Sequence, residues 1–69
     1  MFIAEACTND ELPKIEGEGF FEEDFIELFE IGEVVHLYCD DGHTASGATT
    51  ATCTENGFVS EGSIICVKG

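Results

Sequence analysis

The residues of this chain with the most specific chemistry are its four cysteines, at positions 7, 39, 53 and 66. Zinc ligands usually come as close pairs such as C-x-x-C, but successive cysteines here are 32, 14 and 13 positions apart. We therefore expect two disulfides formed in an oxidising compartment, and neither a metal site nor another cofactor. Cysteine counting leaves three pairings open.

The side chains that could act in catalysis do not form a recognisable site. No serine or cysteine stands in a nucleophile motif, and fifteen acidic residues are too many for any carboxylate pair to be specific. We interpret His36 as an ordinary surface residue and His43 as a packing residue with at most a partial hydrogen bond. The turn Asp40–Asp41–Gly42 is too short for a calcium loop, whose ligands spread over about 12 positions. We expect no enzymatic activity.

The charge balance restricts the class of partner. The formal net charge is −13, from fifteen acidic residues and two lysines. Nucleic acids and anionic membranes both require a cationic surface, so we exclude them as partners. No apolar run approaches the roughly 20 residues of a membrane span, so we expect no membrane insertion. A protein partner with a basic patch is compatible with this charge, although the charge also serves solubility alone.

The length of 69 residues corresponds to one domain. A chain this short buries only about 60% of its unfolded surface, so we expect disulfides to support the core. We place the domain at 7–66, from the first cysteine to the last. Residues 1–6 are expected to be a leader or linker remnant, with Phe2 and Ile3 available for packing, and 67–69 a C-terminal linker remnant.

The segment Glu33–Cys39 gives the clearest strand signal, because it contains two adjacent β-branched residues and a tyrosine. Successive side chains of a strand point to opposite faces. This alternation places Val35, Leu37 and Cys39 on the inward face and the residues between them on the outward face.

Further strands follow at intervals of about 10 to 14 residues, with turn signals between them. Gly47–Cys53 is threonine-rich and strand-like, and Asn56–Gly57 is the strongest short hairpin signal, leading into Phe58–Val59. We expect a last short strand at Ser63–Cys66, with Ile64 or its neighbour buried. The sequence therefore predicts a small all-β fold with short antiparallel strands, stapled by disulfides.

The acidic and aromatic segment Phe20–Ile31 permits two interpretations. Phe21, Phe25 and Phe29 recur at helical spacing, with acidic residues on the other face. The acidic residues have no basic partner four positions away, so a short helix would gain no pairing energy. An extended reading also exists, but it leaves apolar side chains on both faces.

The glycines and cysteines after residue 31 follow a continuous spacing. Its positions are Gly32, Val35, Cys39, Gly42, Gly47, Cys53, Gly57, Ser60 and Cys66. This pattern resembles the sushi module, also called the complement control protein module or short consensus repeat. That family reads Gly-x-x-Val-x-Tyr-x-Cys-x-x-Gly-Tyr-x-Leu-x-Gly, and later Cys-x-x-x-Gly-x-Trp-Ser-x-x-x-Pro-x-Cys.

The chain departs from this family pattern at several positions. The usual tryptophan is Val59, a tyrosine is His43, and the late proline is Ile64. The tryptophan normally fills the core beside the disulfides. Another aromatic side chain must therefore occupy that volume, and the candidates are Phe58, Tyr38 and the phenylalanines of Phe20–Phe29.

The resemblance implies an elongated β-module with little or no helix and with bridges Cys7–Cys53 and Cys39–Cys66. It implies a non-enzymatic, secreted or extracellular protein-binding module, one of several in a larger secreted or receptor protein. The roles that the resemblance implies are complement or cytokine-type immune recognition and secreted immunomodulation. The alternative role is a structural spacer in a tandem array, with no ligand of its own.

The family's variable loop precedes the strand that begins at its first motif glycine, and here it corresponds to Gly17–Ile31. The resemblance therefore favours extended or irregular structure in this acidic and aromatic segment. We expect exposed aromatics ringed by carboxylates to bind a partner there; the other interpretation is that the phenylalanines fill the core. The candidate partner-binding residues are Phe20, Phe21, Glu22, Glu23, Asp24, Phe25, Glu27 and Phe29.

Overall fold

The computed structural model describes residues 6–69 as an elongated, all-β molecule with extents of 49 × 22 × 15 Å. The all-β expectation is confirmed, and the one helical element among these residues is a single 3₁₀ turn. Five residues of the expected leader, Phe2 and Ile3 among them, lie outside the described residues. The elements are β1 (Ala6–Thr8), η1 (Asn9–Glu11), β2 (Gly19–Phe21), β3 (Leu28–Glu30), β4 (Val34–Cys39), β5 (His43–Ala45), β6 (Thr50–Thr54), β7 (Gly57–Val59) and β8 (Cys66–Lys68).

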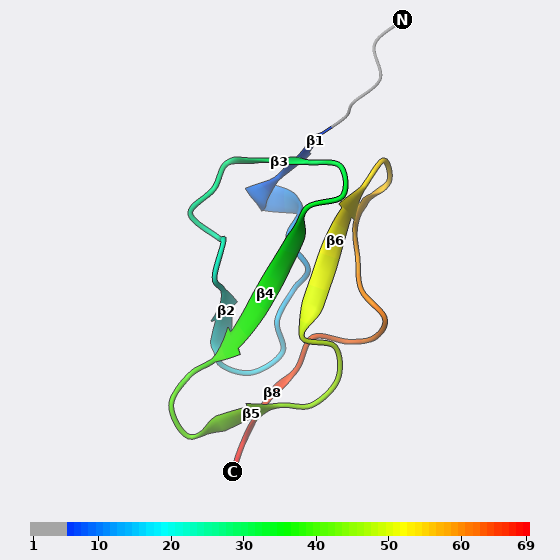
Figure 1. Ribbon diagram of the computed structural model, residues 1–69. Helices are drawn as coiled ribbons and strands as arrows, with labels where there is room; N and C mark the ends of the chain where they lie inside the picture. The colour runs from blue at the N-terminus through cyan, green and yellow to red at the C-terminus, as the bar shows by residue number, and fades with distance from the viewer. Residues whose placement is uncertain (1–5) are drawn as a thin grey trace, which may run out of the picture.

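The strands form three small antiparallel sheets along the long axis (Figure 1). The central sheet has the order β2-β4-β6-β7. The pair β1-β3 lies at one end of the molecule, and the pair β5-β8 lies at the other. The central sheet therefore positions most of the side chains considered below.

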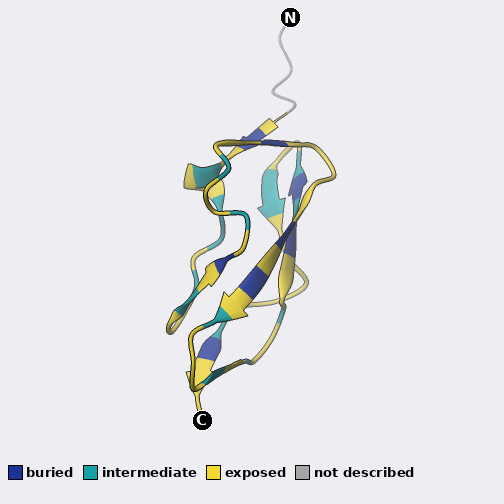
Figure 2. Ribbon diagram, turned by 60° about the vertical axis from the view of Figure 1, so that its left-hand side comes forward, coloured by how far each residue is buried: buried dark blue, intermediate teal, exposed yellow. Residues whose placement is uncertain are grey.

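Strand β4 is an inner strand of the central sheet, because it pairs with β2 on one side and with β6 on the other. Val35 and Leu37 are buried, while the side chains between them face solvent, as their alternation predicts. Figure 2 shows this alternation of buried and exposed residues along the strand. The expected inward and outward faces of this strand are confirmed, with Cys39 partly buried against the core.

The hairpin between β6 and β7 forms where the Asn56–Gly57 signal predicts it, with Glu55 and Asn56 in the turn and Gly57 paired with Thr54. Gly57 has φ of 103°, a conformation that glycine adopts without strain. The Thr54 hydroxyl donates a hydrogen bond to the Gly57 carbonyl at 2.7 Å and accepts one from the Asn56 amide at 3.1 Å. The hairpin is therefore held by a side chain as well as by its backbone.

The last strand begins later than its sequence suggests. We expected Ser63–Cys66, but β8 is Cys66–Lys68 and pairs with β5. The backbone before β8 bonds to two separate loops, since the carbonyls of Ser63 and Ile64 accept hydrogen bonds from the amides of Ala48 and Glu16, respectively. No single partner strand runs beside Ser63 and Ile64, so they form no ladder. Ile64 is nevertheless buried, as expected.

The two disulfides are Cys7–Cys53 and Cys39–Cys66, which confirms the pairing that the family resemblance implies. The first joins β1 to β6, and the second joins β4 to β8. Each end of the central sheet is therefore linked covalently to a terminal two-stranded sheet. This arrangement compensates for a core too small to stabilise the fold by itself.

Two phenylalanines fill the core beside the first disulfide. Phe29 is buried opposite Cys7 in the β1-β3 ladder, and Phe58 lies opposite Cys53 in the hairpin. Their rings meet edge to face with centroids 5.2 Å apart, a favourable aromatic geometry. The expectation that another aromatic replaces the missing tryptophan is confirmed, whereas Val59 itself is half exposed.

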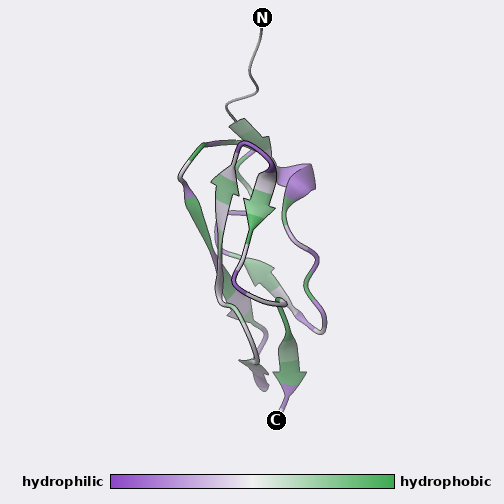
Figure 3. Ribbon diagram, turned by 90° about the vertical axis from the view of Figure 1, so that its right-hand side faces the viewer, coloured by the Kyte–Doolittle hydropathy of each residue, from purple (hydrophilic) through white to green (hydrophobic). Residues whose placement is uncertain are grey.

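The short helix η1 follows β1 at the first end of the molecule and consists of polar residues, seen in purple in Figure 3. The amide of Thr8 donates a hydrogen bond to the Glu11 carboxylate at 2.8 Å. This contact satisfies a backbone donor at the turn. It leaves the carboxylate at the surface, as most acidic residues of this chain are.

Candidate interaction surface

The acidic and aromatic segment contains no helix, so its helical spacing is misleading and the extended or irregular interpretation is confirmed. Between β2 and β3 it forms tight turns, with the Asp24 amide donating to Phe21 and the Ile26 amide to Glu23. Like charges along the segment oppose a helix. In addition, Phe21 and Phe29 belong to strands of two different sheets.

The phenylalanines of this segment separate into two classes. Phe21 and Phe29 are 2% and 1% exposed, so the core-filling interpretation applies to them and they cannot contact a partner. Phe20 and Phe25 are 48% and 78% exposed. Only this second pair is available for recognition. Among the acidic candidates, Glu23 is partly buried, and the exposed members are Glu22, Asp24 and Glu27.

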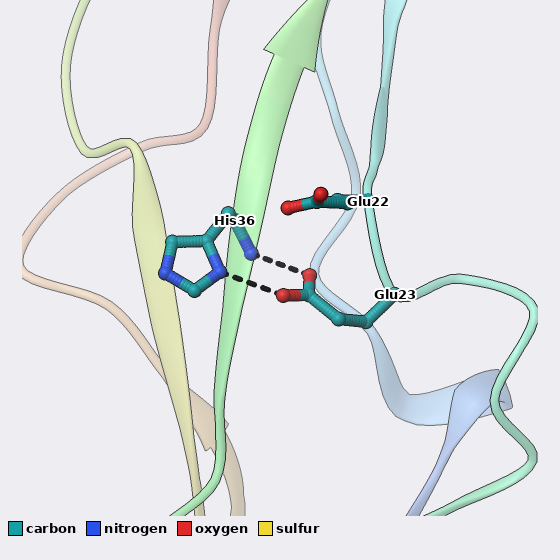
Figure 4. A group of neighbouring side chains, drawn as sticks. All are labelled: Glu22, Glu23 and His36. Atoms are coloured by element: carbon teal, nitrogen blue, oxygen red, sulfur yellow. Dashed lines mark hydrogen bonds and ion pairs between the residues drawn. The ribbon is translucent and has the colours of Figure 1, made fainter.

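A carboxylate holds the turn after β2 against the edge of β4 (Figure 4). The backbone amide of His36 donates to Oε1 of Glu23 at 2.8 Å, and Nδ1 of the imidazole lies 2.6 Å from Oε2. The amide of Glu22 donates to the His36 carbonyl at 2.8 Å. Because β2 ends at Phe21, the Glu23 side chain takes the position that a continuing strand would occupy on this edge.

The pKa of Glu23 reflects this arrangement. Partial desolvation raises the pKa, but the hydrogen bonds from the His36 side chain and backbone outweigh that effect and hold it below the ordinary value of 4.5. The carboxylate is therefore ionised at neutral pH, and each of its oxygens makes one hydrogen bond to His36. His36, which we interpreted as an ordinary surface residue, instead positions this turn.

Glu22, Glu23 and His36 also bring their ligand atoms within 4.8 Å of one another, close enough to contact one metal ion. Sequence reasoning missed this group, because His36 is 14 and 13 positions from the two glutamates and meets them only through the β2-β4 register. The hydrogen bonds between Glu23 and His36 account for the arrangement without an ion.

The outward face of the central sheet collects side chains from three strands. Phe20 lies opposite Tyr38 across β2-β4, with ring centroids 6.0 Å apart. His36 lies opposite Thr50, and Val34 lies opposite Thr52. This face therefore runs from an aromatic end, past the His36 clasp, to an aliphatic and threonine end.

A shallow hollow of about 520 Å³ lies at the aromatic end of this face. Its lining residues are Phe20, Tyr38, Cys39, Asp40 and Asp41. Sequence reasoning had named only Phe20 among them as a candidate contact. The outward position of Tyr38 was readable from strand alternation, but its meeting with Phe20 depends on the strand register.

His43 packs as expected, close to this hollow. Its side chain is mostly buried, and Nδ1 donates a hydrogen bond to the Asp41 carbonyl at 3.3 Å. Nε2 lies 3.9 Å from a carboxylate oxygen of Glu18. The residue therefore supports the turn that carries the two aspartates.

A family model for the Sushi repeat, also called the SCR repeat, matches residues 7–66. The chain belongs to the Sushi family. No curated protein and no solved structure matches it. Sushi modules are generally non-enzymatic protein-interaction units that occur in tandem and typically outside the cell. Residues 6–69 include no helix with the length and apolarity that crossing a membrane requires.

The departures of this Sushi module from its family pattern change the surface as well as the core. Val59 takes the tryptophan position and is half exposed on β7, where it lies opposite Thr52. Phe29 and Phe58 supply the core volume instead. The chain thereby keeps the fold with a different distribution of aromatic side chains, several of which remain at the surface.

Proposed function

We propose that this Sushi module is a non-enzymatic, extracellular protein-binding unit of a larger secreted or receptor protein. Its partner is an extracellular protein that presents a basic patch. Neighbouring Sushi modules in the full-length chain belong to this proposal, as does a role in complement or cytokine-type immune recognition or in secreted immunomodulation. We also propose that the domain spans residues 7–66 and that the short segments on either side of it are linker remnants.

The observation that carries the proposal is the exposure of aromatic rings among carboxylates. Phe20, Phe25 and Tyr38 remain at the surface, with between 48% and 78% of each residue exposed. Exposed Asp24 stands beside Phe25 in the turn, while two aspartates border the hollow at Phe20 and Tyr38. Interfaces concentrate their binding energy in aromatic anchors with a polar rim, which this arrangement provides.

The net charge of −13 supports a basic partner. Complementary charge accelerates encounter and penalises partners of like charge. Among residues 6–69, the ion pairs involve only the two histidines, so no described lysine neutralises these carboxylates. The acidic surface is therefore free to meet positive charge on another protein.

A binding experiment tests this function directly. The disulfide-bonded module is immobilised and exposed to purified extracellular proteins, half of them strongly basic and half strongly acidic. We expect saturable binding by a basic protein, weakened at high salt and weakened again in Phe20→Ala and Phe25→Ala. Binding that responds to salt but not to either aromatic substitution would show that the attraction is a non-specific effect of charge. The absence of any basic protein that binds would refute the proposal.

The alternative function is that of a structural spacer with no ligand of its own. The elongated shape favours it, because β1 and β8 lie near opposite ends of the long axis (Figure 1). Modules joined through such ends would extend one another. A spacer requires no exposed aromatic rings, so unchanged behaviour of the Phe20→Ala and Phe25→Ala variants in the full-length protein would favour it.

A further inference from the structure

We propose that the hollow at the aromatic end of the central sheet is a binding site for one cationic side chain, a lysine or an arginine of the basic partner. The inference rests on the proposed function and makes it more specific. It assigns contacts to Tyr38, Asp40 and Asp41, which sequence reasoning did not consider for binding. The reasons are the chemistry of the lining residues and the way each one is held.

The walls of the hollow are two aromatic rings. Phe20 and Tyr38 are directly opposite in the β2-β4 ladder, and their ring planes are inclined by 38°. Both side chains are about half exposed, so each ring offers surface to a ligand. The face of an aromatic ring attracts ammonium and guanidinium groups, and its carbon surface accepts the aliphatic stem of such a side chain.

Two carboxylates stand at the border of the hollow. Asp40 and Asp41 are both exposed, and among residues 6–69 neither forms an ion pair. A cation lying on the rings would therefore meet unpaired negative charge. A neutral apolar side chain would gain the ring contacts alone, so the site selects for positive charge.

The lining residues are held in place before any ligand binds. The amide of Asp40 donates to the Glu18 carbonyl at 3.0 Å, and its own carbonyl accepts the His43 amide at 2.9 Å. Cys39 is bonded to Cys66, which anchors the end of β4. A site that is already ordered loses less conformational entropy on binding.

Close packing behind the hollow explains why the rings stay at the surface. A Cβ atom added at Gly19 would lie 2.6 Å from Sγ of Cys66 and 2.7 Å from the Tyr38 carbonyl. Glycine is therefore required for β2 to approach β4 and the disulfide this closely. The approach fixes the register that brings Phe20 to Tyr38.

The test uses small probes in place of the unidentified partner. The probes are Nα-acetyl-lysine methylamide and Nα-acetyl-arginine methylamide, with Nα-acetyl-norleucine methylamide as the neutral probe of similar shape. NMR of the isotope-labelled module reports where each probe binds. We expect saturable shift changes at Phe20, Tyr38 and the two aspartates with both cationic probes, and little change with the neutral probe.

Substitutions separate the site from general attraction to an acidic protein. Phe20→Leu and Tyr38→Leu should each weaken binding of the cationic probes about threefold, and Asp40→Asn with Asp41→Asn should weaken it further. Phe25→Leu is the matched control, because it removes an exposed ring beside acidic residues outside the hollow. It should leave probe binding unchanged. Amide spectra establish that every variant retains the fold.

Each result has a definite meaning. Equal binding of the neutral and cationic probes would overturn the inference, as would shift changes spread evenly over the carboxylates of the surface. A loss of binding in Phe25→Leu as large as that in Tyr38→Leu would also overturn it. The protein-binding function is measured separately with whole proteins, so a hollow that binds the cationic probes without any protein binder would support the cation site and refute the protein partner.

Discussion

The two faces of the central sheet use the same strands for opposite purposes. The inward face carries Phe21, Val35 and Leu37, all of which are buried. The outward face carries Phe20, Val34 and Tyr38, which are 40–50% exposed although they too are large hydrophobic residues. Hydrophobicity alone therefore does not decide burial here; the alternation of the strand and the supply of covering layers do.

The comparison also shows where the small size of the fold has consequences. A domain of 69 residues has enough layers to cover one face of its sheet but not the other. Aromatic residues left on the uncovered face lower the solubility of the protein. Surrounding carboxylates offset that cost and restrict the partners that can bind.

The largest expected effect on stability is that of Phe21, and it contrasts with that of its neighbour Phe20 on the opposite face. Phe21→Ala should destabilise the module by about 3–5 kcal/mol, because it opens a cavity in the core. Phe20→Ala should change stability by no more than about 0.5 kcal/mol. Equilibrium urea unfolding, followed by circular dichroism, measures both. Similar losses in the two variants would contradict the assignment of faces.

Removal of a disulfide should rank next. The double substitution Cys39→Ala with Cys66→Ala should cost about 2–5 kcal/mol, mainly because the unfolded chain gains freedom. That is comparable to the whole stability of a domain this small. Urea unfolding of the variant beside the wild-type protein measures the loss. An unchanged midpoint would show that the core alone suffices at this end of the sheet.

The clasp between Glu23 and His36 should contribute a smaller amount that depends on pH. Glu23→Gln should cost about 1 kcal/mol near neutral pH, because a charge-assisted acceptor is lost. The pKa of Glu23 is lowered in the folded state, so its contribution is present above the ordinary value of 4.5 and disappears as pH falls through the lowered value.

Urea midpoints of wild type and Glu23→Gln should therefore differ well above pH 4.5 and converge as the pH falls through the lowered pKa of Glu23. Glu27→Gln is the control, because it removes an exposed carboxylate of the same segment. A constant difference between wild type and Glu23→Gln across this range would show that the charge of Glu23 does not stabilise the turn.

The smallest expected effect on stability is that of Phe25→Ala, since Phe25 is the most exposed of the large hydrophobic residues in the acidic and aromatic segment. Its free energy of unfolding should change by no more than about 0.5 kcal/mol. Its binding to a basic protein should nevertheless weaken if the segment contacts the partner. A stability loss comparable to that of Phe21→Ala would show that Phe25 packs in the core in solution.

Much of the fold was accessible from the sequence, because its signals are local. These signals are the alternation in Glu33–Cys39, the hairpin at Asn56–Gly57 and the spacing of the cysteines. The last strand was placed early at Ser63, because β-branched residues mark extended chain whether or not a partner strand lies alongside. The helical spacing of Phe21, Phe25 and Phe29 was misleading for a different reason, because like charges along the segment oppose a helix and the strands of Phe21 and Phe29 belong to different sheets.

The candidate site was less accessible. The sequence identified an acidic and aromatic segment, but it did not separate Phe20 from Phe21 or connect Glu23 with His36. It also did not bring Asp40 and Asp41 to the rings of Phe20 and Tyr38. Each of these relations joins residues of different strands or turns.

By itself, the sequence determined an acidic, all-β Sushi module with two disulfides, because composition, strand periodicity and cysteine spacing are properties of the chain alone. The tertiary structure alone decided which aromatic rings are buried and which carboxylates lie near the exposed ones. The physical reason is the register between β2 and β4, since a shift of one residue would exchange the two faces. Close packing of Gly19 against Tyr38 and Cys66 opposes such a shift.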